Sequence, residues 1–175
     1  MPNHVLNVWK ISGMHTKDMN YVLNKITKKI SENERVIDFD LIIPEPRFKR
    51  DCPKDCIVNS KSYVQEDKDR PWFNWYKWHI NHWGTKWNAY DGYTHVGKDY
   101  IEFNFNTAWD FARPIVNRLA RMGYDLDIQY ADEDIGSNCG YLTYDSATGE
   151  WTDHDLDDPE KFARDLWGWE EEDEE

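Results

Sequence analysis

The feature of this 175-residue sequence that most constrains its fold is the order in which strand-like and helix-like apolar patterns alternate along the chain. Val5, Leu6, Val8, Trp9 and Ile11 make the segment 4–11 apolar on both sides, which predicts a strand that is covered on both faces of a sheet. Apolar residues three and four positions apart over residues 19–30 predict a helix with one buried face. A second strand is predicted at residues 36–43, and Pro44 and Pro46 should end it because proline lacks the N–H that a sheet needs.

The second half of the chain repeats this strand–helix–strand order. Residues 100–106 alternate, so Ile101, Phe103 and Phe105 should share the buried face of a strand. A helix is predicted to begin at Pro114, because proline suits a first helical turn and costs about 3 kcal/mol in a helix interior. The elements predicted after it are strands at 124–130 and 141–144, a turn that leads back through Trp151, and a short helix at 159–167.

An insert, at about residues 44–92, separates the two halves and holds a Trp-rich helix between Pro71 and Gly84, followed by a loop at residues 87–92. Without the insert and the C-terminal additions, the order of elements is βαββαβ. We therefore predict an α+β, ferredoxin-like fold: a split βαβ antiparallel sheet with an inserted Trp-rich helix, an extra C-terminal hairpin and a terminal helix. The expected domain covers residues 1–152, and residues 153–175 form an acidic helix and tail.

Acidic residues are concentrated in that tail. The chain has a formal net charge of −13, and residues 153–175 hold twelve acidic and two basic residues. Phe162, Leu166, Trp167 and Trp169 form an apolar stripe in the same segment. Two hypotheses follow: the stripe packs on the protein's own surface, or the acidic face is displayed to a basic partner. Direct binding of nucleic acid is not expected, because phosphate is repelled by this charge.

Several segments of the sequence carry a family resemblance. They are MPNHV at residues 1–5 with Asn7 and Gly13, FDLIIP at 39–44, WYKW at 75–78, NHWGTKWNAYD at 81–91, FNTAW at 105–109 and YADEDIGSNCG at 130–140. In these segments the chain resembles the ferredoxin-like domains of Api-type phage proteins, also called the YubB-like ferredoxin-like proteins. The resemblance spans roughly residues 1–145 and leaves out the acidic end and the Cys52–Cys56 segment. It implies a ferredoxin-like fold and an origin in a phage or other mobile element, and it supplies no catalytic residues.

The Trp-rich segment is the first candidate for a binding site. Trp72, Trp75, Trp78, Trp83 and Trp87 cannot share one helical face, so one face should cover the sheet. Either the other face is exposed and marks a binding surface, or the helix is packed on both sides. The predicted binding residues are Trp78, Trp83, Trp87, Asn88, Tyr90 and Asp91.

Two further groups of residues are candidates. Cys52, Cys56, His79 and His82 make up a donor set that zinc accepts, although the alternative is a surface cysteine pair and two unrelated histidines. An acidic surface is predicted from two sets of carboxylates, Asp132, Glu133 and Asp134 with Glu170, Glu171 and Glu172.

The functional prediction rests on what the sequence contains and on the family it resembles. No phosphate-binding loop, serine-hydrolase or zinc-protease motif occurs in the chain, which favours a non-enzymatic accessory protein that acts by binding. The predicted partner is a bacterial host protein, of which a defence protein is the leading case, and the chain would inhibit it. The alternative is a protein that sequesters a nucleotide-like small molecule, or a small enzyme, with a pocket between the Trp helix and the sheet.

The sequence also predicts the location of the protein and its need for cofactors. No apolar run reaches the roughly 20 residues that a membrane span needs, and three cysteines fit a reducing compartment. We therefore expect no membrane contact, no cofactor, and a location in the cytoplasm of the host cell.

Overall fold

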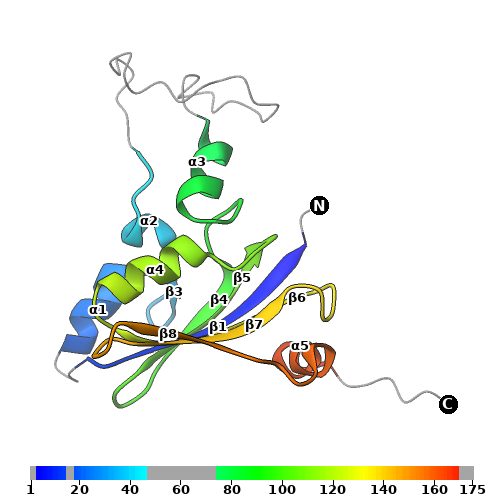
Figure 1. Cartoon of the computed structure of the whole chain (residues 1–175). Helices are drawn as coiled ribbons and strands as arrows, with labels where there is room; N and C mark the ends of the chain where they lie inside the picture. Colours follow the sequence, from blue (N-terminus) through cyan, green and yellow to red (C-terminus); the bar gives the residue numbers. More distant parts are fainter. Residues whose placement is uncertain (1–2, 15–17, 47–73, 170–175) are drawn as a thin grey trace.

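A computed structural model of the chain describes residues 3–14, 18–46 and 74–169 (Figure 1). Among these residues, six strands form one antiparallel sheet. In spatial order they are β4 (Tyr90–Val96), β5 (Ile101–Ala108), β1 (His4–Ser12), β6 (Asp125–Asp132), β7 (Cys139–Asp145) and β8 (Glu150–His154). β1 lies between β5 and β6 and is antiparallel to both, which is the split βαβ arrangement. The predicted α+β, ferredoxin-like fold is therefore confirmed.

The helices lie on both faces of this sheet, but unequally. Figure 1 shows α1 (Met19–Ile26), α2 (Phe39–Ile42) and α4 (Arg113–Arg121) on one face and α5 (Pro159–Trp167) on the other. Val5, Asn7, Trp9 and Ile11 of β1 are fully buried beneath the first group, and the alternate residues of the strand, which face the other way, are only half-buried. The prediction that residues 4–11 are covered on both faces was therefore only partly right, because α5 reaches only one end of the opposite face.

The core is rich in aromatic rings. Trp9, Phe39 and Phe105 contact one another with ring centroids 4.8–6.2 Å apart. Ile101, Phe103 and Phe105 are buried as their alternation predicted. Burial of such large side chains, at 1.5–3 kcal/mol or more each, is what stabilises a domain of this size.

The second half of the chain agrees closely with its apolar pattern. α4 begins at Arg113 with Pro114 in its first turn, and it buries Ile115, Val116 and Leu119. Since proline has no N–H to donate there, it fits where the helix has no acceptor.

The prediction of a strand at residues 36–43 was wrong. Only Arg35–Ile37 forms a strand, β3, which pairs with β2 (Thr27–Lys29) in a two-stranded sheet. α2 follows at once, because the Asp38 carboxylate accepts the N–H of Asp40 and caps the helix. Ile30, expected on the buried face of the first helix, lies beyond the end of that helix in the β2–β3 turn and is exposed.

The sheet position beside β5 is taken by β4 instead. Residues 87–92 were expected to form a loop, yet Tyr90 already pairs with Asn106. Between Tyr90 and Tyr93 the register shifts at a β-bulge. The bulge interrupts the alternation of apolar and polar residues by which a strand is recognised in a sequence. The sequence pattern therefore did not predict β4.

α3 (Trp75–His82) is the helix of the Trp-rich insert, and Asn74 caps its first turn by accepting the N–H of Lys77. Among the described helices, none is both long and apolar enough to cross a membrane.

Candidate functional site

The Trp-rich helix supplies core residues before it supplies a surface. Trp78 and Trp83 are buried, and the Trp83 ring lies edge-on to Phe39. Its indole N–H donates to the Ile43 carbonyl at 2.9 Å, which attaches α3 to the segment after α2. These two predicted binding residues are therefore structural in this arrangement.

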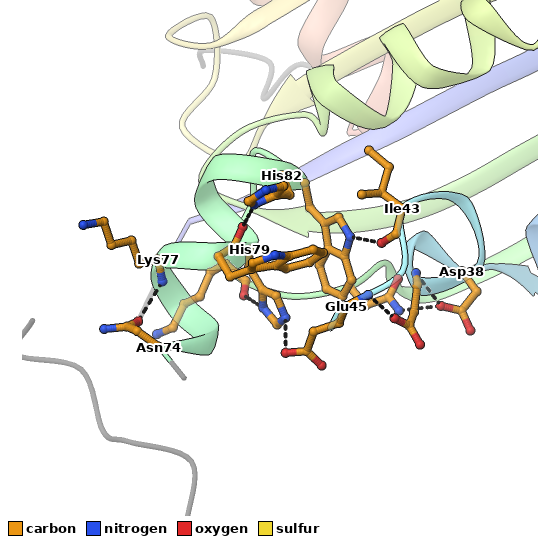
Figure 2. Close-up of polar contacts among 12 residues, drawn as sticks. Asp38, Ile43, Glu45, Asn74, Lys77, His79 and His82 are labelled. Atoms are coloured by element: carbon orange, nitrogen blue, oxygen red, sulfur yellow. Dashed lines mark hydrogen bonds and ion pairs between the residues drawn. The ribbon is translucent and has the colours of Figure 1, made fainter. Parts of the chain in front are cut away.

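His79 and His82 are held by contacts within the insert (Figure 2). His79 stacks on Trp83, with Nδ1 2.8 Å from the Lys86 carbonyl and Nε2 3.3 Å from the Glu45 carboxylate. Both of these partners are hydrogen-bond acceptors, so each ring nitrogen of His79 faces an oxygen atom. His82 stacks on Trp78, and its Nδ1 lies 2.9 Å from the Trp78 carbonyl.

These positions bear on the zinc hypothesis without testing it. Cys52 and Cys56 lie outside the described residues. Within the part of the chain that the structure describes, no three histidine, cysteine or acidic side chains come together as metal ligands. The two histidines fit the alternative well, because their contacts stabilise the inserted helix.

Asn88, another predicted binding residue, joins two segments of the chain by hydrogen bonds. Its Oδ1 accepts the N–H of Phe39 at 2.9 Å, and its Nδ2 donates to Asp38 at 2.6 Å. The loop before β4 is thereby fixed to the start of α2.

Exposed aromatic rings gather beside this loop. Trp87 and Trp109 are 38% and 39% exposed, and the Lys86 ammonium lies 4.7 Å and 5.3 Å from their ring centroids. Tyr76 of α3 lies edge-on to Trp109, and Tyr90 lies edge-on to Trp87. These five residues, Tyr76, Lys86, Trp87, Tyr90 and Trp109, are called the aromatic surface below.

Trp109 has an unusual backbone. Its φ is +76°, in the left-handed region that bulky residues rarely adopt. Such a conformation costs of order 1–3 kcal/mol and persists where neighbours hold it. Here the Trp109 N–H donates to the Asn3 carbonyl at 3.0 Å, and its own carbonyl accepts from Asn138 at 3.2 Å. Trp109 was not among the binding residues predicted from the sequence, although it lies at the end of the FNTAW segment and directly after a strand.

Tyr90 lies at the inner edge of the aromatic surface. Its hydroxyl donates to the Thr107 carbonyl at 3.2 Å and lies 2.5 Å from Nδ1 of His4. Burial, with the nearby carboxylates of Asp91 and Glu133, raises the pKa of Tyr90 to about 12. The phenol therefore stays protonated and holds the start of β4 to β1 and β5.

The predicted acidic surface is divided by the structure. Asp132 is buried, and its carboxylate accepts from the Asp134 N–H and from Asn3. Glu133 and Asp134 are exposed, although Glu133 also accepts the N–H of His4. Glu170, Glu171 and Glu172 lie outside the described residues.

A groove of about 340 Å³ lies between the β2–β3 hairpin and the start of β4, and Tyr90 is one of its lining residues. It is lined by Ile30, Val36, Ala89, Tyr90, Asp91, Gly92 and Phe105. Two predicted binding residues, Tyr90 and Asp91, therefore meet here, while Trp87 belongs to the aromatic surface.

The comparison with known protein families bears directly on this region. The family model described as the ferredoxin-like domain in Api92-like protein matches residues 82–175. The chain belongs to this family. The matched residues run from the end of α3 through α5 and include the acidic end, which the resemblance in the sequence left out. No curated protein and no solved structure matches the chain.

Proposed function

We propose that this protein is a non-enzymatic accessory protein of a phage or other mobile element, and that it acts by binding a bacterial host protein, such as a component of a defence system. The partner would be occluded in the host cytoplasm. The aromatic surface is the observation that carries the proposal. Trp and Tyr are the residues that most often dominate binding energy at protein interfaces.

Two details support this surface as an interface. Trp109 is exposed although its backbone is strained, and strain of this kind is concentrated at functional sites. Asn3 bonds both to Trp109 and to Asp132, so these two residues lie close together. Glu133 and Asp134 directly follow Asp132 and therefore lie at the same end of the sheet as Trp109. An aromatic surface next to exposed carboxylates suits a partner with basic side chains.

A second candidate function is binding of a small molecule, which the groove beside Tyr90 favours because its volume lies within the range of ligand sites. Its walls are largely apolar, so a nucleotide-like ligand is a poor match.

The test of the proposal is a comparison of tagged full-length variants in bacterial lysates, read by mass spectrometry. Trp87→Ala and Trp109→Gly remove the two exposed indoles, and glycine accepts the backbone conformation of Trp109. Trp151→Ala is the matched control, since Trp151 is 41% exposed but lies on the edge strand β8.

We expect a host protein that the wild type and the Trp151 variant retain and the other two lose. Its purified form should bind the wild type directly, with at least tenfold weaker binding for either variant. Retention of the same proteins by all four forms would contradict the proposal.

A further inference from the structure

The groove beside β4 has a chemical character that the aromatic surface lacks. Ile30 and Val36 of the hairpin form one wall, and Phe105 of the sheet is part of the lining. Among the lining residues that the structure describes, Asp91 is the one with a charged side chain. The groove therefore combines apolar walls with a single carboxylate.

The bulge in β4 places Asp91 among the residues that line the groove. Asp91 has a φ of +48°, a conformation that aspartate tolerates better than most residues. At Gly92, a Cβ atom would lie 2.6 Å from both the Asn104 carbonyl oxygen and the Phe105 Cβ, so only glycine allows this approach. The strand thus rests directly on β5 at the bulge, and Asp91 is held among the lining residues.

We infer that this groove receives an arginine side chain of the protein partner. The methylene stem of arginine would pack against Ile30, Val36 and Phe105, and the guanidinium would pair with the Asp91 carboxylate. Arginine suits the site better than lysine, because its planar group also stacks on an aromatic face such as that of Tyr90. The identity of the occupant rests on the proposed function, since the arginine belongs to the bound protein.

The surrounding charges are consistent with this assignment. Arg35, next to Val36 in the hairpin, donates to Thr27 and Asn24 and so is bonded to its own neighbours. The Asp91 carboxylate acts on Tyr90, where it contributes to the raised pKa of the phenol. Among the described residues that line the groove, none carries a positive charge that would offset the Asp91 carboxylate.

The groove is also continuous with the aromatic surface. Tyr90 lines the groove and lies with its ring centroid 6.1 Å from that of Trp87. A partner that covers Trp87 and Trp109 would therefore bring its neighbouring side chains to the mouth of the groove. Arginine is among the residues enriched at the centre of such interfaces.

The test uses three capped amino acids that differ only at the end of the side chain. N-acetyl-arginine amide carries the charge, N-acetyl-citrulline amide is its neutral isostere, and N-acetyl-norleucine amide keeps only an apolar stem. Each is titrated into the full-length protein while the backbone amide resonances of Ala89 and Gly92 are followed by NMR. We expect saturable shifts with the arginine probe and at least threefold weaker binding of the other two.

The matched variants are Asp91→Asn and Asp99→Asn. Asparagine tolerates the backbone of Asp91 and removes only its charge, so the preference for the arginine probe should disappear. Asp99 is an exposed residue of the β4–β5 turn and does not line the groove, so its variant should behave as the wild type.

Equal binding of the arginine and citrulline probes to the wild type, or no saturable shift with any probe, would overturn the inference. Stronger binding of norleucine would instead assign the groove to an apolar small molecule and overturn it too. A negative result with these probes leaves the experiment on Trp87 and Trp109 unaffected. Neither tryptophan lines the groove, and Trp87 contacts only one lining residue, Tyr90. A partner lost on Trp109→Gly but kept at full affinity by Asp91→Asn would therefore support the proposed function and reject the arginine.

Discussion

Trp109 shows how a single residue can be held in a conformation that its side chain disfavours. The left-handed backbone is maintained by hydrogen bonds from both sides, to Asn3 and from Asn138. Since glycine adopts this conformation freely and alanine does not, the two substitutions separate the backbone from the indole.

We expect Trp109→Gly to be more stable than Trp109→Ala by about 1 kcal/mol, because both lose the indole and only the second keeps the strained backbone. Urea denaturation of the two variants measures the difference. An alanine variant as stable as the glycine variant would show that the backbone at this position carries no strain.

Tyr90 makes a prediction about alkaline pH. Its pKa of about 12 lies above the ordinary value of 10, so the folded protein keeps the phenolic proton that the unfolded chain releases. Stability from this residue should therefore be complete below about pH 10 and should be lost progressively as the pH rises towards 12. Ultraviolet titration of phenolate absorbance in the wild type and in Tyr90→Phe isolates the late-titrating group. A Tyr90 that titrates near pH 10 would show that the phenol is not held as described.

At the scale of elements, the end of α3 and the loop that follows it contact parts of the chain that are distant in sequence. Trp83 packs on Phe39 and donates to Ile43, while Asn88 bonds to Asp38 and Phe39. Two neighbouring tryptophans of one segment, Trp83 and Trp87, thus have opposite roles.

Trp83→Ala should destabilise the fold by about 3–5 kcal/mol, because it leaves a cavity and an unpaired carbonyl at Ile43. Trp87→Ala should cost less than about 1 kcal/mol, since that ring is partly in water. Thermal unfolding of both variants provides the comparison. Similar losses in the two would contradict the division between a core residue and a surface residue.

At the scale of the whole molecule, the terminal helix bears on the first of the two hypotheses for the acidic end, that its apolar stripe packs on the protein's own surface. The Trp167 indole N–H donates to the carbonyls of Ala131 and Asp132, and Ala163 is fully buried. Through Trp167 and Ala163, α5 therefore packs on the protein's own sheet, on the face opposite α1 and α4 (Figure 1). Trp169 stacks on Trp167 and stays exposed.

Deletion of residues 170–175 removes six acidic residues and leaves this packing intact. We expect the unfolding midpoint to stay the same, because exposed charges contribute little to stability. If the acidic end also attracts a basic partner, the association rate should fall and should depend less on salt. Stopped-flow measurements at several salt concentrations test this, and unchanged rates would leave the acidic end with a role in solubility.

The sequence by itself determined the elements whose signals are local. The alternation of Ile101, Phe103 and Phe105 and the proline that opens α4 were each correct, and their order along the chain indicated the ferredoxin-like fold. These signals are reliable because burial on one face and the missing N–H of proline act over a few neighbouring residues.

Only the tertiary structure decided which residues reach the surface and the groove. β4 pairs with β5 across a bulge, so its alternation is broken, and residues 36–43 divide into a strand and a capped helix because Asn88 and Asp38 meet there. The sequence does not show which tryptophans of this region are exposed. Trp83 is buried by contacts with a segment 40 or more positions away. The backbone of Trp109 is held by hydrogen bonds with Asn3 and Asn138. A periodicity reports which residues can be buried together, but the neighbours that bury them are supplied by the rest of the fold.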